Sequence, residues 1–264
     1  MIPKTIHYIW FGGRPLGEKE KKCLASWEKY LPDYKIIRWD ESSFDVGCNQ
    51  YCLEAYQAKK WAFVSDYVRL WVLVNHGGIY MDTDVEVLRS LDEFLDNQAF
   101  SGFETPESIP TGIMASERGF ELFKLLLEDY ENRSFVLPNG EMDLTTNVEA
   151  ITRLCLGKGL KLNNMFQVIE GLSLYPKEVF CPKDYQTGKI EITNNTATIH
   201  HFSGTWKTEN EKQILAFQQK ILRKVPILKP IIAAHIAKLA YCINNRDFTI
   251  VKKDIKRKLK LHKQ

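Results

Sequence analysis

The stretch Trp61-Ala-Phe-Val-Ser-Asp-Tyr-Val-Arg-Leu-Trp-Val-Leu-Val-Asn-His-Gly-Gly-Ile-Tyr-Met-Asp-Thr-Asp84 decides the fold of this chain. It begins with a long apolar segment that has helical character, and Gly77-Gly78 ends that helix. A short apolar run follows over residues 79–81, which is typical of a strand buried on both faces. We therefore predict a helix, a turn and a strand whose end carries Asp82 and Asp84.

Two charged side chains, Asp66 and Arg69, lie on the otherwise apolar helix. They are three residues apart, so they share one face of it. A buried arginine offers five donors in a fixed fork, and a neighbouring carboxylate orients that fork. The pair is therefore either a group that grips a polar ligand or a purely structural ion pair.

The two aspartates at the strand end, Asp82 and Asp84, are two residues apart. In an extended segment they point the same way, about 7 Å apart along the chain. Two such carboxylates repel each other unless a cation or a hydrogen-bond network offsets their charge. Their hard oxygen atoms suit Mg²⁺ or Mn²⁺, ions that keep open positions for substrate phosphates. An isolated Asp-Thr-Asp is more often a solvated turn, but the buried strand before it favours a metal site.

These motifs resemble those of the sugar-nucleotide-dependent glycosyltransferases of family 32, and they are similar to the glucosylating domains of large clostridial toxins. The matching segments are Ser65–Arg69, Gly77–Tyr80 and Asp82–Asp84, and the resemblance covers roughly residues 1 to 207. It implies a GT-A type fold, a nucleotide-sugar donor, and Mn²⁺ or Mg²⁺ as the cofactor. It also implies that the helix pair Asp66 and Arg69 binds the hydroxyl groups of the donor sugar.

The segments before this stretch alternate between strand and helix patterns. They are a strand over 2–11, a helix over 17–30, a strand over 34–39 and a helix through 52–56. This order predicts an α/β fold, a Rossmann-like mixed sheet that is mainly parallel and is flanked by helices. Ligands bind at the carboxyl ends of the strands in such sheets. Trp10 and the two aspartates lie at predicted strand ends.

Trp10 follows the first strand and precedes Gly12-Gly13. It is either a core residue or a face for a ligand, and the resemblance implies that it lies against the nucleotide base. Asn147 opens a later helix, with Thr145 or Thr146 as the expected cap. Local capping is one role for Asn147, and the resemblance implies another, near the donor sugar. The Thr-Gly-Pro that the family usually carries here is absent.

The segment 197–207, Ala-Thr-Ile-His-His-Phe-Ser-Gly-Thr-Trp-Lys, alternates like a strand that ends at Ser203. Neutral imidazole is a good ligand for Mn²⁺, although a lone histidine is more often a satisfied core residue. The pattern His201-x-x-Gly204-x-x-Lys207 is similar to the closing motif of related retaining transferases. The resemblance implies His201, in preference to His200, as the metal ligand together with Asp84. Asp82 would then lie near the ribose of the nucleotide or beside the ion.

The same resemblance gives roles to three further residues of this segment. Lys207 would reach the diphosphate, and Ser203 is a second candidate metal ligand because the toxin-like members use a serine at a similar place. Trp206 would close over the nucleotide, with core packing as the alternative.

The composition is that of an ordinary globular protein. The chain has 264 residues, of which 44% are hydrophobic and 26% charged. The net charge of +3 is too small to indicate a nucleic-acid partner. Its six cysteines include no Cys-x-x-Cys pair, and no secretory signal or run long enough to span a membrane is evident. We therefore expect a cytoplasmic setting.

The composition shifts after residue 208, so we predict a catalytic domain over 1–208 and a helical, basic extension over 209–264. Two helical segments, 213–225 and 231–243, are separated by prolines. Six Lys or Arg residues then lie between 252 and 260. This tail is either a solvated basic helix or one that binds the inner face of the cytoplasmic membrane.

Together these features predict a metal-dependent, retaining glycosyltransferase. It would move a hexose from a nucleotide sugar to a glycan or lipid-linked oligosaccharide acceptor, in bacterial surface or capsular polysaccharide synthesis. A UDP-sugar is favoured as the donor, with GDP-mannose as the alternative because mannosyl relatives use GDP. The competing hypotheses are a non-catalytic nucleotide- or metal-binding module and a metal-dependent phosphohydrolase or nucleotidyltransferase.

Overall fold

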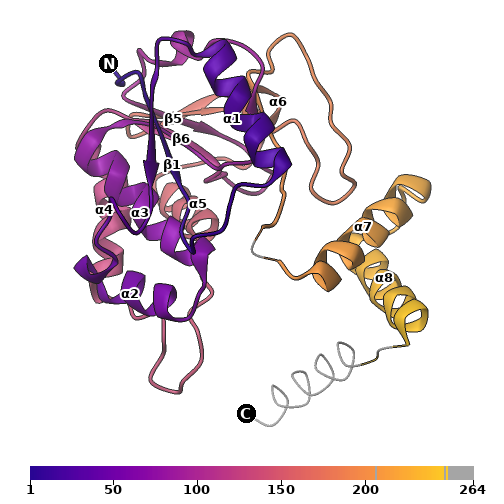
Figure 1. Cartoon of the computed structure of the whole chain (residues 1–264). Coiled ribbons are helices and arrows are strands. Elements are labelled where there is room, and N and C mark those ends of the chain that lie inside the picture. Colours follow the sequence, from indigo (N-terminus) through magenta and orange to yellow (C-terminus); the bar gives the residue numbers. More distant parts are fainter. Residues whose placement is uncertain (206, 247, 249–264) are drawn as a thin grey trace. The chain divides into compact units, whose positions relative to one another are not determined.

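The computed structural model describes residues 1–205, 207–246 and 248 (Figure 1). The chain divides into two compact units. The first contains Met1–Lys183 and Glu191–Ser203, and the second contains Asp184–Ile190 and Gly204–Gln264. The division into a catalytic domain over 1–208 and an extension over 209–264 stays a prediction.

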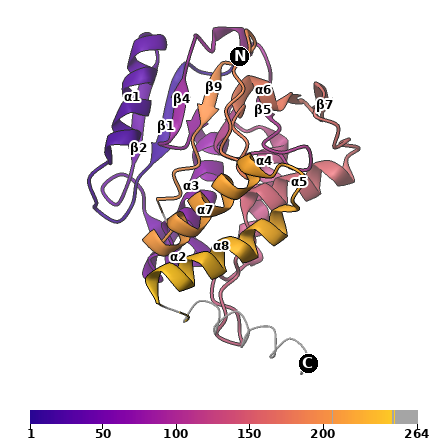
Figure 2. The same ribbon diagram turned by 90° about the vertical axis from the view of Figure 1, so that its right-hand side faces the viewer.

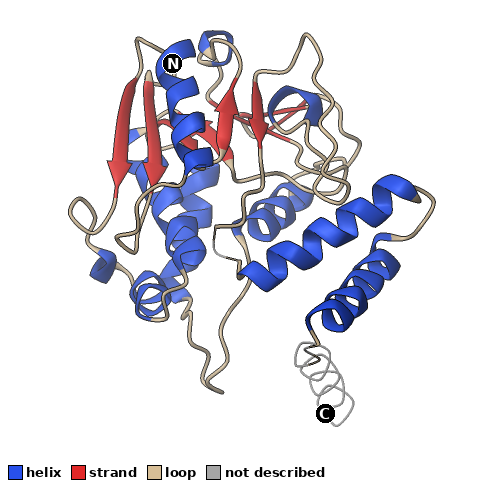
Figure 3. Cartoon of the chain, turned by 45° about the vertical axis from the view of Figure 1, so that its right-hand side comes forward, coloured by secondary structure: helices blue, strands red, loops and turns tan. Residues whose placement is uncertain are grey.

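A seven-stranded sheet forms the centre of the described part of the first unit, in the order β2-β1-β3-β6-β5-β8-β7 (Figure 3). Its strands are β1 (Thr5–Ile9), β2 (Lys35–Trp39), β3 (Gly78–Met81), β5 (Ala99–Gly102), β6 (Ile113–Ser116), β7 (Gln167–Ile169) and β8 (Leu172–Tyr175). The pairs β1–β2, β1–β3 and β5–β8 are parallel, whereas β3–β6, β5–β6 and β7–β8 are antiparallel. The predicted mixed sheet is confirmed. It is less parallel than we expected, because β6 runs back between β3 and β5.

Helices and short 3₁₀ turns surround this sheet. The helices of the first unit are α1 (Glu18–Tyr30), α2 (Gln50–Gln57), α3 (Trp61–His76), α4 (Glu121–Asp129), α5 (Asn147–Gly157) and α6 (Lys177–Phe180). The 3₁₀ turns are η1 (Val46–Cys48), η2 (Asp92–Phe94) and η3 (Tyr130–Asn132). Thr146 caps α5, as the sequence predicts, because its side chain accepts a hydrogen bond from the amide of Glu149.

The two faces of the sheet are buried in separate cores, and β3 contributes to both. Tyr80 packs in the core that contains the apolar side chains of α2, α3, α4 and α5, whereas Ile79 and Met81 pack in the core that contains those of α1 and α6. Figure 1 shows α3 and α4 on the opposite side of β1 from α1. Side chains of a strand alternate between faces, so a strand covered on both sides must be apolar throughout.

The double glycine after α3 allows β3 to lie close against β1. Gly77 and Gly78 have positive φ angles of 67° and 100°. A Cβ atom at Gly78 would lie 2.6 Å from the carbonyl oxygen of Thr5. Glycine is therefore required here both for the backbone conformation and for the close approach of β1.

A small antiparallel ribbon, β4 (Val85–Val87) with β9 (Thr198–His200), completes the first unit. Its register places Val85 opposite His200. Figure 2 shows β4 and β9 side by side. Helix α1 packs against β4, where the indole Nε1 of Trp27 donates a hydrogen bond of 2.7 Å to the carbonyl of Val85. The ribbon thus joins a late segment of the chain to the residues that follow β3.

In the second unit, α7 (Glu209–Lys224) and α8 (Pro230–Asn245) pack on each other around a small core. Its buried members are Ile214, Ala237, Tyr241 and Cys242. A capping box between Thr208 and Glu211 starts α7 four residues before the predicted start at 213. Among the described residues, no helix is both long and apolar enough to cross a membrane. The basic tail over 252–260 lies outside the described residues.

Candidate functional site

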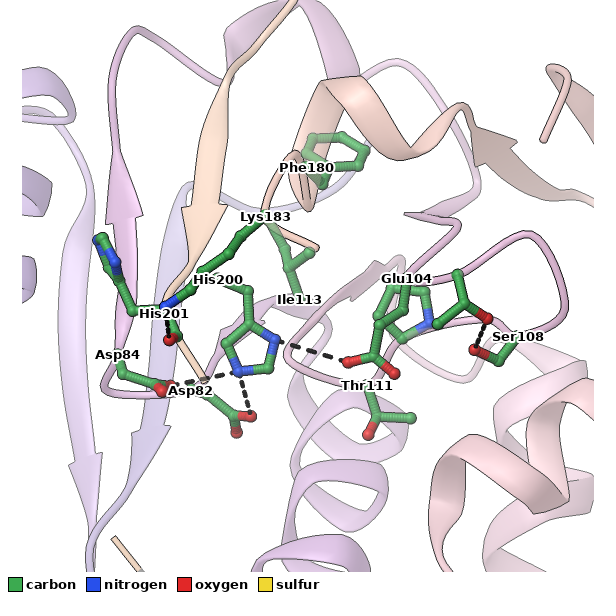
Figure 4. Close-up of polar contacts among 12 residues, drawn as sticks. Asp82, Asp84, Glu104, Ser108, Thr111, Ile113, Phe180, Lys183, His200 and His201 are labelled. Atoms are coloured by element: carbon green, nitrogen blue, oxygen red, sulfur yellow. Dashed lines mark hydrogen bonds and ion pairs between the residues drawn. The ribbon is translucent and has the colours of Figure 1, made fainter. Parts of the chain in front are cut away.

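The residues after β3 bring two aspartates and a histidine together (Figure 4). The amide of Asp82 donates to the carbonyl of Gly112 at 2.8 Å, and the carbonyl of Asp82 accepts from the amide of Val85 at 3.0 Å, which closes a turn. This turn places Asp84 beside β9. His200 Nε2 lies 3.4 Å from Asp84 Oδ1 and 3.7 Å from Asp82 Oδ2. One side-chain atom from each residue lies within 4.8 Å of the other two.

The histidine in this cluster is His200, whereas the sequence analysis favoured His201. Successive residues of a strand point to opposite faces, so only one of the two adjacent histidines can face the aspartates. His201 instead contacts Glu86, with 2.7 Å between its Nε2 and the carboxylate Oε2. In Figure 4 the two imidazole rings point in different directions. The placement therefore changes the candidate metal ligand from His201 to His200.

Charge within the cluster is balanced between Asp84 and His200. Burial by itself raises the pKa of the Asp84 carboxyl, but the neighbouring His200 and the amide of Ser203, which donates to Oδ2 at 2.5 Å, hold that pKa well below its ordinary value. Burial lowers the pKa of His200, yet Asp84 raises it well above the ordinary value. The carboxylates thus require a cation beside them, either a protonated imidazole or a metal ion.

The donor set fits a divalent metal ion. Two carboxylates and an imidazole are ligands that Mn²⁺ accepts. Ser203 Oγ and His200 Nδ1 are buried and have no hydrogen-bond partner among the described residues. Such polar atoms are rare in folded proteins, and they indicate a site that a ligand completes. Ser203, the second ligand candidate from the sequence, donates its backbone amide to Asp84, and its role as a ligand stays a prediction.

Gly112 leaves the room that His200 occupies. A Cβ atom at this position would lie 2.7 Å from His200 Nδ1 and 3.3 Å from Asp82 Oδ2. Any larger residue at 112 would therefore displace the imidazole or the carboxylate. The sequence analysis did not single out this glycine.

The predicted pair Asp66 and Arg69 lies on α3 next to the cluster. Both side chains are buried, and Arg69 Nη2 lies 3.2 Å from Asp66 Oδ1 and 3.5 Å from Asp82 Oδ1. The same guanidinium donates through Nη1 to the carbonyl of Thr111 at 2.5 Å and through Nε to that of Ser65 at 3.1 Å. Arg69 thus connects the helix pair to the strand-end aspartates.

Asn147 holds the start of α5 against Asp66. Its backbone amide donates to Asp66 Oδ2 at 3.3 Å, and its side-chain Nδ2 donates to the carbonyl of Asp66 at 2.6 Å. Its Oδ1 accepts a 2.6 Å hydrogen bond from the hydroxyl of Tyr130. Burial raises the pKa of Asp66 to about 6, against the opposing effects of Arg69 and the Asn147 amide. These bonds give Asn147 a structural role beside Asp66, and its expected contact with a sugar stays a prediction.

Trp10, Lys207 and Trp206 are the remaining predicted ligand residues. Trp10 is partly buried, and its Nε1 donates to the carbonyl of Arg14 at 2.6 Å. Lys207 belongs to the second unit, where its Nζ donates to the hydroxyl of Tyr185. Trp206 lies outside the described residues. The nucleotide contacts of these three residues stay predictions.

Glu104 and Lys183 are neighbours of the cluster that the sequence analysis missed. Glu104 Oε1 lies 3.8 Å from His200 Nδ1, and Lys183 Nζ donates to the carbonyl of His201 at 2.5 Å. Glu104 lies two residues after the end of β5, so its place after an apolar strand was a usable signal. Nothing in the sequence around Lys183 separates it from other surface lysines.

Comparisons with known proteins agree with this reading of the central stretch. The family described as "Glycosyltransferase sugar-binding region containing DXD motif" matches residues 17–101. Inositol phosphoceramide mannosyltransferase 3 of Schizosaccharomyces pombe is 32% identical over 122 residues, which is 45% of this chain and 34% of that protein. Mannosyl phosphorylinositol ceramide synthase SUR1 of Saccharomyces cerevisiae is 30% identical over 129 residues, 44% of this chain and 31% of that protein. The chain therefore matches about a third of the length of these curated relatives.

A solved glycosyltransferase involved in the glycosylation of the major capsid of PBCV-1 is 12% identical, with a TM-score of 0.45, over 83% of this chain and 98% of that one. The segment 17–101 thus resembles glycosyltransferase sugar-binding regions that contain a DXD motif, and the predicted resemblance is confirmed. Asp82-Thr-Asp84 lies inside the matched segment, whereas His200 lies outside it.

Proposed function

We propose that this protein is a metal-dependent, retaining glycosyltransferase that moves a hexose from a nucleotide sugar to a glycan or lipid-linked acceptor. The observation that carries the proposal is the cluster of Asp82, Asp84 and His200 beside the buried Asp66–Arg69 pair. Its aspartates lie in the segment that matches sugar-binding regions containing a DXD motif. The region matched is a third of the related proteins, so their activity enters here as a proposal.

In this proposal Asp82, Asp84 and His200 hold a divalent ion, Mn²⁺ or Mg²⁺. Bound there, the ion supplies positive charge for the diphosphate of the leaving nucleotide. Arg69 donates hydrogen bonds to hydroxyl groups of the donor sugar, and Asp66 orients the guanidinium. The carbonyl of Thr111 fixes Arg69 from the other side.

The remaining roles follow the sequence analysis. Trp10 would stack on the nucleotide base. Lys207 would contact the diphosphate, and Trp206 would cover the nucleotide. Ser203 completes the ligands of the ion, and Asn147 keeps Asp66 in place near the sugar.

The donor we propose is a mannosyl or other hexosyl nucleotide. The sequence analysis favoured a UDP-sugar over GDP-mannose, but both relatives above are named for transfer of mannose. We therefore place GDP-mannose first among the donors to be tested. Both names also refer to a ceramide lipid, which supports a lipid-linked acceptor.

Contact with a membrane surface would bring the enzyme to such an acceptor. Helix α8 exposes a stripe of apolar side chains at positions 232, 236, 239 and 243, with helical spacing. The basic tail adds about 1 kcal/mol for each Lys or Arg near an anionic surface. Cosedimentation with anionic vesicles, which weakens when the tail lysines and Arg257 are replaced by Gln, would support this proposal. Unchanged vesicle binding in that variant would contradict it.

The function is tested by incubating the protein with GDP-mannose, UDP-glucose or UDP-galactose, each with Mn²⁺. We expect slow release of the nucleoside diphosphate and free sugar from one donor, and loss of that release in EDTA. Release of the nucleoside monophosphate and sugar phosphate would instead identify a phosphohydrolase. Binding of a nucleotide without turnover in the presence of acceptor glycolipids would favour a binding module.

A further inference from the structure

Glu104 lies against the side of His200 that faces away from the aspartates. His200 Nε2 faces Asp82 and Asp84, whereas Nδ1 lies 3.8 Å from Glu104 Oε1 (Figure 4). Nδ1 is buried and has no hydrogen-bond partner among the described residues. The distance to Glu104 exceeds the upper end of the N–H···O range, about 3.2 Å, by about 0.6 Å, so a shift of that size would form a hydrogen bond.

The surroundings keep both partners of this contact close to each other and restrict them to small movements. The imidazole lies close against Gly112 and fills the space that a side chain there would take, since a Cβ at 112 would lie 2.7 Å from Nδ1. The ring of Phe202 lies on the imidazole, with 4.2 Å between the ring centroids. The backbone amide of Glu104 donates to the carbonyl of Ser108 at 3.0 Å, and the hydroxyls of Thr105 and Ser108 are 2.7 Å apart. The loop that carries Glu104 is therefore closed by its own hydrogen bonds.

Cys181 is the other group near Nδ1, because Glu104, Cys181 and His200 form a second set of side chains with atoms within 4.8 Å of one another. A thiol is a weak hydrogen-bond acceptor and a carboxylate is a strong one. Glu104 is therefore the better partner for an Nδ1 proton.

We propose that Glu104 is a positioning residue that accepts the Nδ1 proton of His200 and so leaves Nε2 as the ligand of the divalent ion. This inference rests on the proposed function, since it assumes that Asp82, Asp84 and His200 hold that ion. A histidine has two ring nitrogens, and a metal can bind only the one without a proton. Metal-binding histidines commonly donate their second N–H to a carboxylate, which fixes the tautomer and the ring orientation.

The first test measures Mn²⁺ binding by the electron paramagnetic resonance signal of the free ion. The variants are Glu104→Ala, Glu104→Gln and, as a matched control on the same loop, Glu107→Ala, which alters an exposed carboxylate. We expect Glu104→Ala to weaken Mn²⁺ binding about 10- to 100-fold. Glu104→Gln should retain more affinity, because its amide oxygen still accepts from Nδ1–H. Glu107→Ala should bind as the unaltered protein does.

The second test reads the imidazole directly. Nitrogen-15 NMR of histidine-labelled protein with Mg²⁺ should show Nδ1 protonated in the unaltered protein, and a mixture of tautomers in Glu104→Ala. If Glu104→Ala fails to fold, the tautomer is measured in Glu104→Gln instead. The carboxamide keeps the size of the side chain but is a weaker acceptor than a carboxylate, so it should weaken the preference for the Nδ1–H form. An unchanged tautomer and unchanged Mn²⁺ affinity in the folded Glu104 variants would overturn the inference.

A third measurement separates the two faces of His200. Co²⁺ bound to Asp82, Asp84 and His200 should show no thiolate-to-metal absorption. A thiolate band that disappears in Cys181→Ser would place the ion on the Glu104 side and overturn the inference. If the unaltered protein binds no Mn²⁺, or if Asp84→Asn binds it equally well, the metal site of the proposed function fails as well. Mn²⁺ binding that depends on Asp84 but not on Glu104 would contradict the positioning role alone.

Discussion

Two clusters of charged side chains meet at Asp82, and they differ in how completely the protein satisfies them. On α3, Asp66 and Arg69 receive partners from three other segments, through Asn147, Thr111 and Asp82. In the other cluster His200 Nδ1 and Ser203 Oγ are buried without a partner among the described residues. Most of the polar groups of the first cluster are engaged in contacts within the protein. The second still has buried polar atoms that can bind a ligand, which is a property expected of a binding site.

Removing a member of the satisfied cluster should have the largest effect on stability. Asp66→Ala leaves the Arg69 guanidinium buried beside fewer charges and removes the acceptor for the Asn147 amide. We expect a loss of about 3–5 kcal/mol in the free energy of unfolding, measured in urea. Asp129→Ala, which breaks the half-exposed ion pair with Arg133, is the control and should cost no more than about 1 kcal/mol.

The same Asp66→Ala variant also tests the proposed sugar contact, under conditions where it stays folded. Turnover should fall further than the affinity for the nucleoside diphosphate. If the variant loses turnover but keeps its stability, Asp66 acts on the ligand and not on the scaffold, and the contrast drawn between the two clusters is wrong.

Removing a member of the incompletely satisfied cluster should affect activity and spare the fold. Asp84→Asn weakens the candidate metal site and should lower turnover by roughly 100- to 1,000-fold, the scale seen when one electrostatic contact to a transition state is lost. Its melting temperature without metal should fall by less than that of Asp66→Ala, because the Asn oxygen still accepts from the Ser203 amide and the repulsion from Asp82 is relieved, although the attraction to His200 is lost. Full activity of Asp84→Asn, or of the unaltered protein in excess EDTA, would show that this cluster is not the active site.

His7 and His200 differ in the same way as the two clusters. His7 has partners on both ring nitrogens, since Nδ1 accepts from Trp39 Nε1 at 3.1 Å and Nε2 donates to the carbonyl of Gly77 at 3.0 Å. Burial lowers its pKa to about 4. In the unfolded chain this histidine is protonated as the pH falls below about 6.5, whereas in the folded protein it stays neutral until about pH 4. Stability is therefore lost as the pH falls through this window.

His7 should lower the free energy of unfolding by at most about 3 kcal/mol as the pH falls through that window. Carboxylates titrate in the same range, so the measurement is a comparison of unfolding free energies at pH 7 and pH 5 in the unaltered protein and in His7→Gln. The variant should show the smaller decrease. An equal decrease in both proteins would mean that His7 is charged in the folded state.

The smallest effect is expected at His201. Its pair with Glu86 is partly exposed, so His201→Gln should change the free energy of unfolding by no more than about 1 kcal/mol. Mn²⁺ affinity should stay within about twofold of the unaltered protein, whereas His200→Gln should lose about tenfold or more. The reverse result would restore the preference for His201.

The central stretch could be predicted because its constraints are local. A helix of apolar residues, a double glycine and a three-residue apolar run leave few alternatives, and α3 and β3 end where Gly77 and Asp82 predict. Asp82 and Asp84 follow directly, since they are fixed to the end of that strand. The direction of β6 could not be predicted, because a short buried strand has the same apolar residue pattern whether it runs parallel or antiparallel to its neighbours.

The choice between His200 and His201 is a long-range question that local patterns do not answer. It depends on the register between β4 and β9, which pairs Val85 with His200. A shift of one residue would turn the other histidine toward the aspartates. The part played by Asn147 was hidden for a similar reason, because its partners Asp66 and Tyr130 lie 81 and 17 residues away along the chain.

The β4–β9 ribbon also sets the time at which this site exists during biosynthesis. Asp84 and Ser203, which it brings together, are 119 residues apart. A ribosome that adds 5–20 residues per second needs roughly 6 to 24 s to cover that distance. Strands β1, β3, β5 and β6 are complete long before β9 emerges, so the aspartates spend this interval without His200 beside them. The nascent protein therefore acquires most of its sheet early and the full set of candidate metal ligands only with the last strand.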